Sequence, residues 1–251
     1  MLSANCQGLQ DYKKRYDVIN YLKKKNPAVI CLQDTHLITK DEYNLRSLWG
    51  NDCYVHGKRT NARGVATLIN NNFEYDIRNV NKEFDDVLII DLRISDIEVR
   101  LINIYAPNND SPIFFQNIED SVKNNPQDYV IICGDYNLVL NPTIDCFNYI
   151  NVNNPNARNK VLALISEHSL LDAFRYFNVN KRKYTWKKRQ PVKQARLDYC
   201  LISRNLSDLT ANCYIIPGYR SDHAIVKLDL LINKFKKGKG IWKFNINWLK
   251  Y

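Results

Sequence analysis

The 251-residue sequence has little glycine and proline and no long apolar run. With eight glycines and eight prolines it contains no low-complexity segment, and its 45% hydrophobic content indicates one large folded core. No stretch reaches eighteen apolar residues, and Met1–Gly8 lacks the basic-then-apolar layout of a signal peptide. We therefore expect a soluble, intracellular protein with no membrane partner.

The sequence also lacks any CxxC pair, although it contains seven cysteines. Without such pairs a zinc site or a dithiol redox site is not indicated. Several cysteines lie inside apolar runs, such as Cys133 in YVIICGD and Cys200 in LDYCLI. A free thiol packs there as a small hydrophobic group, so we expect all seven cysteines to be reduced.

Acidic residues are absent from two segments that carry much of the positive charge. The formal net charge is +10, residues 181–196 hold eight basic residues, and residues 233–251 hold six lysines. A basic balance suits a polyphosphate partner, because each neutralised phosphate releases condensed counterions. A solvated basic face is an equally good explanation of the charge taken alone.

The apolar pattern predicts a mixed order of strands and helices. Helical spacing is found in Tyr12–Lys25, in Ile113–Val122 and in Ala157–Phe177, the last as one helix or two. Apolar or β-branched runs predict strands at Ala28–Gln33, Val65–Ile69, Val87–Ile94, Val99–Tyr105, Tyr129–Cys133, Tyr184–Lys187, Arg196–Ile202, Cys213–Tyr219 and Ala224–Ile232. This order favours an α/β protein of four layers, an α/β/β/α sandwich of two mixed sheets with outer helices. We place the domain at residues 1–232 and interpret residues 233–251 as a basic tail or linker, whose Trp242 and Trp248 could dock back on a surface.

Polar residues stand at the ends of several of these strands, where burial is costly unless they face solvent or a partner. They are Asp34, Tyr105, Asp135, Asn137, Asp198, Asp222 and His223. Each has a plainer explanation. Asp34 could cap a helix, Asp135 and Asn137 could form a turn, and His223 could be an ordinary surface histidine.

Together, however, the motifs occur in one order along the chain. They are ANCQGL (4–9), CLQDTHL (31–37), GVATLI (64–69), NIYAPN (103–108), ICGDYN (132–137), YTW (184–186), RLDYCLIS (196–203) and YRSDHAIVKLDL (219–230). This combination resembles the endonuclease/exonuclease/phosphatase superfamily of DNase I-like fold. It is most similar to the apurinic-type endonuclease domain of LINE-type (non-LTR) retrotransposon proteins.

The resemblance implies a metal-dependent phosphodiesterase site. Asp34 stands where the family has its acidic metal ligand, with Gln7 as a second metal-site residue and Asn5 lining the same site. Tyr105 and Asn137 would contact the scissile phosphate, and Asp135 would activate water or protonate the leaving oxygen. His223, paired with Asp198, would act as a charged imidazole or as a base, and Asp222 would complete the acidic shell. The implied cofactor is Mg²⁺, for which Mn²⁺ can substitute.

Two residues depart from the family pattern. The family's acidic ligand is usually Glu where this chain has Asp34, and the family often has Asp where this chain has Gln7. We expect weaker metal affinity from both changes, with the chemistry retained.

In relatives, a hairpin near Thr185 enters or borders the DNA minor groove. The resemblance therefore implies that the following residues contact DNA: Tyr184, Thr185, Trp186, Lys187, Lys188 and Arg189. Lysine and arginine there would position phosphates, while sequence preference would come from duplex shape. The alternative is an exposed loop that only keeps the protein soluble.

The expected function is Mg²⁺-dependent nicking of one strand of double-stranded DNA, leaving a 3′-hydroxyl that primes a fused reverse transcriptase (target-primed reverse transcription). Such a domain would be monomeric in isolation, made in the cytoplasm and active in the nucleus. The alternatives are repair at abasic sites and a DNA-binding domain with weak catalysis. Phosphatases that act on lipid headgroups share the fold but fit the basic segment less well.

Overall fold

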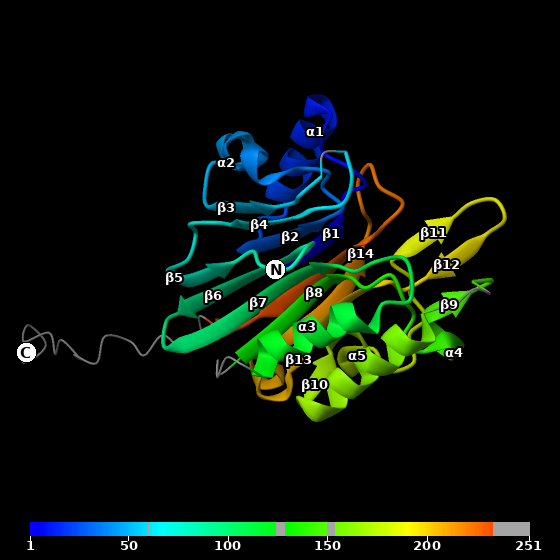
Figure 1. Ribbon diagram of the computed structural model, residues 1–251. Helices are drawn as coiled ribbons and strands as arrows, with labels where there is room; N and C mark the ends of the chain where they lie inside the picture. Colours follow the sequence, from blue (N-terminus) through cyan, green and yellow to red (C-terminus); the bar gives the residue numbers. More distant parts are fainter. Residues whose placement is uncertain (60, 124–128, 150–153, 233–251) are drawn as a thin grey trace, which may run out of the picture.

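The computed structural model describes residues 1–59, 61–123, 129–149 and 154–232. Two six-stranded sheets lie face to face, and helices cover the outer face of each (Figure 1). The predicted four-layer α/β/β/α architecture is confirmed. The tail predicted at residues 233–251 lies outside the described residues.

The first sheet has the strand order β14-β15-β1-β2-β4-β3. Its strands are β1 (Leu2–Asn5), β2 (Val29–Gln33), β3 (Cys53–His56), β4 (Val65–Ile69), β14 (Thr210–Ile216) and β15 (Ile225–Leu230). β1 and β2 run parallel, whereas the other neighbours in this sheet are antiparallel. Helices α1 (Tyr12–Lys23) and α2 (Glu42–Trp49), the second preceded by the 3-10 turn η1 (Thr39–Asp41), cover its outer face (Figure 1).

The second sheet has the order β10-β13-β8-β7-β6-β5. Its strands are β5 (Asp76–Asn81), β6 (Val87–Ile94), β7 (Ile97–Tyr105), β8 (Tyr129–Asp135), β10 (Leu170–Asp172) and β13 (Asp198–Ser203). The central pair β7 and β8 is parallel. Helices α3 (Pro112–Lys123) and α5 (Pro155–Glu167) pack on its outer face.

A third, three-stranded sheet projects from one end of the sandwich (Figure 1). It consists of β9 (Cys146–Phe147), β11 (Trp186–Lys188) and β12 (Lys193–Ala195). The connecting elements are the short helices α4 (Pro142–Asp145) and α6 (Ala173–Phe177) and the 3-10 turn η2 (Arg204–Leu209).

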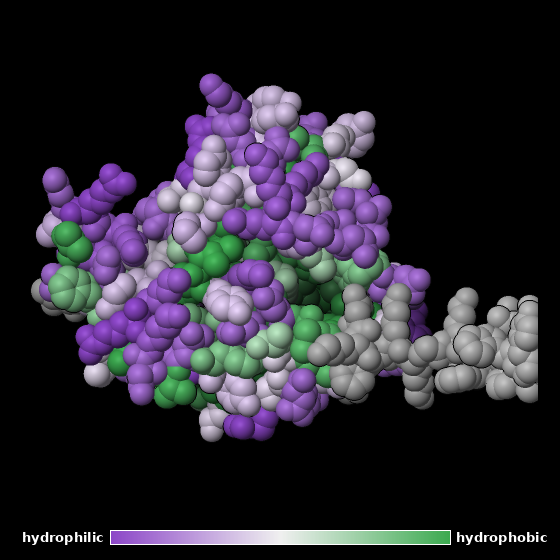
Figure 2. Space-filling model, turned by 180° about the vertical axis from the view of Figure 1, so that it is seen from behind, coloured by the Kyte–Doolittle hydropathy of each residue, from purple (hydrophilic) through white to green (hydrophobic). Residues whose placement is uncertain are grey.

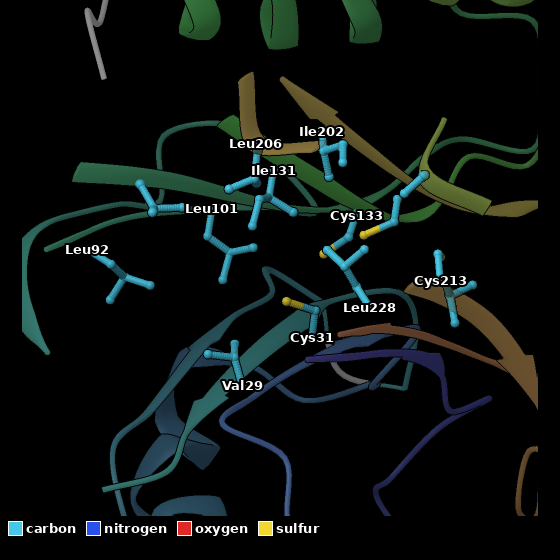
Figure 3. Close-up of a cluster of buried hydrophobic side chains, with 14 of the residues drawn as sticks. Val29, Cys31, Leu92, Leu101, Ile131, Cys133, Ile202, Leu206, Cys213 and Leu228 are labelled. Carbon is cyan, nitrogen blue, oxygen red and sulfur yellow. The ribbon is translucent and has the colours of Figure 1, made fainter. Parts of the chain in front are cut away.

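The main core lies between the two large sheets (Figure 3). Val29 and Cys31 of β2 point toward Leu101 of β7 and toward Ile131 and Cys133 of β8, and all five are nearly or completely buried. Such burial on both faces explains why these strands are continuous apolar runs. All seven cysteines are free thiols. No helix in the described ranges is long and apolar enough to span a bilayer.

The stretch Ala157–Phe177, predicted as one helix or two, contains the two helices α5 and α6. The strand β10 between them was not predicted; it follows Ser169, which adopts a left-handed backbone conformation with φ +49°, and it pairs with β13. The strand predicted at Cys213–Tyr219 begins earlier, at Thr210, and ends at Ile216. Elements α2, β3, β5, β9, β10 and β12 were not predicted.

Candidate active site

The polar strand ends lie together because the two parallel pairs end at the same edge of the sandwich. In the first sheet Asn5 is the register partner of Gln33, the residue before Asp34. In the second sheet Tyr105 is paired with Asp135, which is also opposite Asp198 on β13. The chemistry-bearing side chains of both sheets therefore face one region.

A chain of contacts joins Asp198, His223 and Asp135. His223 Nδ1 lies 2.8 Å from Asp198 Oδ2, and its Nε2 lies 3.9 Å from Asp135 Oδ2. All three side chains are at least nine-tenths buried. The glycine of the ICGD motif is required here, since a Cβ on Gly134 would lie 1.9 Å from the Ile104 carbonyl oxygen.

Burial and mutual charge set the ionisation of this cluster. Burial alone lowers the pKa of His223, but the Asp198 carboxylate, followed by Asp135, raises it to about 10. Burial and the Asp198 charge raise the pKa of Asp135 to about 7, against the opposing effects of His223, the Asn137 amide and Asn5. At neutral pH the imidazole is therefore charged, while Asp135 can either hold or release a proton.

Hydrogen bonds fix the orientation of Asp135. Asn5 Nδ2 donates to Asp135 Oδ2 over 2.8 Å, and the Asn137 backbone N–H donates to Oδ1 over 2.9 Å. Asn137, with φ +50°, is an asparagine in the left-handed region that this residue type adopts readily. Its side chain donates to the Ala106 carbonyl over 2.8 Å, which fixes it beside the carboxylate.

Asp34 and Tyr105 form the second half of the site. Burial, followed by the nearby Asp34 and Asp135 carboxylates, raises the pKa of the Tyr105 hydroxyl, which therefore keeps its proton at neutral pH. The Asp34 side chain is 17% exposed, and its Oδ1 lies 3.2 Å from Nε2 of His36. The Asp34–Tyr105 pair is thus more open to solvent than the Asp135 cluster.

Gln7 and Asp222 form the outer part of the site. The backbone N–H of Asp222 donates to Gln7 Oε1 over 3.1 Å, so the Gln7 side chain connects two loops. The Asp222 carboxylate accepts a hydrogen bond of 2.8 Å from Trp186 Nε1 and is 37% exposed. Their predicted metal-site and acidic-shell roles stay predictions.

Residues of the predicted DNA-contact segment divide into two groups. Lys187 and Lys188 of β11 and Arg189 of the following turn are exposed on the β11–β12 hairpin. Thr185 is only 1% exposed, and its hydroxyl accepts hydrogen bonds from the Leu197 and Asp198 backbone N–H groups. It is therefore placed to hold Asp198 in position from beneath the surface, whereas Tyr184 and Trp186 are half-buried.

The structure adds site residues that the motifs did not single out. His36 contacts Asp34, and the Arg63 guanidinium lies 4.4 Å from the Tyr105 ring centre while donating to the Tyr105 carbonyl over 2.6 Å. Ser221 Oγ donates to the Asn5 carbonyl over 2.8 Å. His36 and Ser221 each lie within two residues of a predicted site residue, which is the signal that could have found them.

A buried polar bridge joins the two sheets behind the site. Gln33 Nε2 donates to Asn103 Oδ1 over 2.8 Å, and Asn103 Nδ2 donates to the Ala66 carbonyl over 2.9 Å. Gln33 and Asn103 are both completely buried. Because Gln33 precedes Asp34 and Asn103 lies two residues before Tyr105, this bridge connects the strand ends that carry that pair.

The side chains around Asp34 fit a hard divalent cation. Mg²⁺ keeps several waters and usually takes one or two carboxylates together with substrate phosphate oxygens, and Asp34 offers a partly exposed carboxylate. The Asp135, Asp198 and His223 ligand atoms also lie within 4.8 Å of one another. Their hydrogen bonds and burial suit that cluster better to proton transfer. A third group, Glu119, Glu167 and His168, lies on the outer helices, where lysines already pair with Glu119.

Comparison with known proteins gives the same fold. Among curated proteins, the 149 kDa protein of transposon TX1 from Xenopus laevis is 24% identical over 97% of this chain, which spans 19% of that protein. The AP endonuclease of Archaeoglobus fulgidus superposes with a TM-score of 0.74 at 19% identity, covering 91% of this chain and 98% of its own. The catalytic domain of Xenopus laevis APE2 gives 0.74 at 20% identity, with 91% and 90% covered. The Neisseria 3′ phosphatase NExo, bound to a product DNA hairpin, gives 0.72 at 18% identity, with 91% and 98% covered.

A family model described as Endonuclease/Exonuclease/phosphatase matches residues 2–223, which extend from β1 to His223. This range includes both halves of the site and every motif except the end of the last one. The chain therefore belongs to the Endonuclease/Exonuclease/phosphatase family and is a metal-dependent phosphodiesterase.

Proposed function

We propose that this protein is a Mg²⁺-dependent DNA endonuclease that nicks one strand of a duplex and leaves a 3′-hydroxyl end. The observation that carries the proposal is the buried contact chain Asp198–His223–Asp135 beside the more exposed Asp34–Tyr105 pair. Hydrolysis of a phosphodiester needs a proton acceptor, positive charge near the phosphate and donors for its oxygens. These side chains provide the acceptor, one cation and the donors.

The ionisation states suggest a division of roles. Asp135, whose pKa is about 7, accepts the proton of the attacking water at neutral pH. The charged His223 stabilises negative charge that develops on the phosphate, while Asp198 orients it. Asn137 and Tyr105 act as hydrogen-bond donors to the phosphate oxygens. Asp34 would hold a divalent metal, which would supply further positive charge.

The biological role that we propose is target-primed reverse transcription. The chain spans about a fifth of the length of its transposon relative, which leaves room in such a protein for a polymerase. The 3′-hydroxyl at the nick would then serve as primer, on nuclear DNA and with the chain acting as a monomeric domain. The exposed hairpin residues Lys187, Lys188 and Arg189 would contact phosphates of the double-stranded substrate.

A plasmid-nicking assay tests this proposal. Supercoiled plasmid is incubated with the protein in Mg²⁺, in Mn²⁺ and in EDTA, together with the variants Asp135→Ala and Asp120→Ala. The second variant removes a carboxylate on α3, outside the site. We expect nicking in either metal, none in EDTA, and loss of nicking only with Asp135→Ala. Nicking in EDTA would contradict the proposal, as would an active Asp135→Ala variant.

Two further arms define the substrate and the product. Extension of the nick by an added DNA polymerase without end treatment would show a 3′-hydroxyl, whereas a blocked end would contradict the priming role. An oligonucleotide duplex with one abasic site is compared with an intact duplex. A strong preference for the abasic duplex would favour a repair enzyme instead.

A further inference from the structure

An apolar groove opens between the two large sheets at the end opposite the active site. Its volume is about 230 Å³, and its apolar lining includes Phe73, Leu92, Ile94, Leu101, Leu230 and Ile232. None of the described residues that line it has a charged side chain. Figure 2 shows a hydrophobic hollow on this face, beside the point where the described chain ends. We call it the end groove.

The position of the end groove follows from strand direction. Met1, Val29 and Val99 line it, and they stand at the beginning of β1, β2 and β7. Asn5, Asp34 and Tyr105 stand at the opposite ends of these strands. The end groove is therefore separated from the active site by the length of the core.

The lining favours side chains of a polypeptide over a small-molecule ligand. Pockets for small molecules typically have volumes of roughly 300–1,000 Å³ and a few convergent polar groups that orient the ligand. The end groove is smaller, and Asn26 and Asn72 are the polar side chains among its described lining residues. An exposed apolar hollow of this kind suits one or two large hydrophobic side chains.

The next part of the sequence offers such side chains. Ile232 lines the groove, and nineteen residues follow it, at 233–251. Within them, Trp242, Phe244, Ile246 and Trp248 alternate with the polar residues 243, 245 and 247. In an extended segment this period of two places all four apolar side chains on one face.

The intervening residues 233–241 are long enough to bring that segment back. Nine residues in extended form span about 30 Å, at roughly 3.3–3.6 Å per residue. Gly238 and Gly240 lie in this stretch and permit a reversal of direction. Its four lysines, which carry charge that the apolar lining cannot pair, would remain in solvent.

We propose that the segment Trp242–Trp248 of this same chain binds in the end groove, with its two tryptophan side chains inserted between the sheets. Residue 251 would then lie at the end opposite the active site, so that DNA access stays open. This inference does not depend on the proposed endonuclease function.

Fluorine NMR of the full 251-residue chain labelled with 5-fluorotryptophan tests the proposal. The sequence has four tryptophans, so single Trp→Phe variants assign the four resonances. We expect the Trp242 and Trp248 resonances to be displaced from that of free fluorotryptophan. Leu230→Asp puts a charge into the end groove, and Phe244→Asp puts one into the segment, and each should remove the displacement. Ile113→Asp, at an exposed apolar position on α3, is the matched control and should leave it intact.

The other two tryptophans report folding in the same spectra. Trp49 is buried in the first sheet's outer core and Trp186 lies in the hairpin, so unchanged resonances there show that a variant is folded. Phe244→Asp lies outside the folded sandwich and keeps the test decisive if Leu230→Asp unfolds. Tail resonances at the free position in the wild-type chain would overturn the proposal. A displacement that appears only at high protein concentration would also overturn it, because it would indicate a second copy as occupant.

Discussion

The two ends of the same strands have opposite chemistry. In β7, Val99 and Leu101 line the end groove, whereas Asn103 joins the buried bridge and Tyr105 faces Asp34 and Asp135. In β2, Val29 is part of the apolar core, and Gln33 leads into Asp34. Both strands thus change from apolar to polar along their length.

Because of this difference, the groove end contributes mainly to the stability of the fold and the site end mainly to catalysis. Burial of apolar surface at the groove end stabilises the fold, whereas polar burial at the site end costs free energy unless every group has a partner. Most site groups have one, but Asp198 Oδ1 is buried with no hydrogen-bond partner among the described residues, and the Asp135 pKa is raised. The site end therefore holds closely balanced charges, which is the condition in which a small change of protonation alters reactivity.

The largest expected effect concerns Asp198, which raises the pKa values of both His223 and Asp135. We expect Asp198→Asn to reduce the nicking rate by roughly 10²–10⁴-fold, the usual contribution of proton-transfer groups. In the wild-type protein the rate should rise as Asp135 loses its proton near pH 7 and fall as His223 loses its proton near pH 10. Removing the Asp198 charge lowers both pKa values, so both limbs of the residual pH–rate profile should move to lower pH. Limbs that stay in place would refute the charge coupling.

At the groove end, the comparison predicts a loss of stability with the chemistry unchanged. Leu101 is 2% exposed, so Leu101→Ala should lower the free energy of unfolding by about 2–5 kcal/mol, the range for a large-to-small change in a core. Urea unfolding measures this change. The nicking rate per folded molecule, measured at low temperature, should equal that of the wild-type chain, and a clear drop would show that the two ends are coupled.

Two residues further along β7, a substitution of Asn103 should lower both the free energy of unfolding and the nicking rate. Asn103→Leu removes one of the two acceptors of Gln33 Nε2, which keeps Ser3 Oγ, and the side-chain donor to the Ala66 carbonyl. Losing hydrogen bonds between buried groups costs about 1–3 kcal/mol. Because the bridge ends beside Asp34 and Tyr105, the nicking rate per folded molecule should also fall. If Asn103→Leu lowers the stability but nicks DNA as fast per folded molecule as Leu101→Ala, the bridge contributes to stability only.

Sequence reasoning predicted the four layers because strands buried on both faces are unmistakable apolar runs. It missed β5, which has no buried residue, and β9 and β10, which have two and three residues, because none of these has a recognisable period. The break at Ser169 was invisible because Leu170 and Leu171 suit a helix as well as a short strand.

Less of the site than of the fold could be predicted from the sequence. The motifs supply the residue types, but the pKa values depend on burial and on distances across two sheets. The position of Thr185 beneath Asp198 and the bridge between Gln33 and Asn103 also depend on contacts between residues far apart in sequence. These partners become apparent only when both sheets are in place.

The smallest expected effect concerns the surface rather than the buried site. Lys187→Ala, Lys188→Ala and Arg189→Ala together should flatten the dependence of log Kd on log salt for duplex DNA, by about 0.9 for each phosphate that the hairpin no longer neutralises. The control is the triple alanine variant of Lys23, Lys24 and Lys25, which removes the same charge near the start of β2, at the groove end. Because the control lysines lie away from the proposed DNA-contact hairpin, their removal should change the slope much less than the hairpin variant does. Equal slopes in the two variants would mean that the hairpin does not bind phosphates directly, and that the DNA-facing end is distinguished from the groove end by its catalytic groups alone.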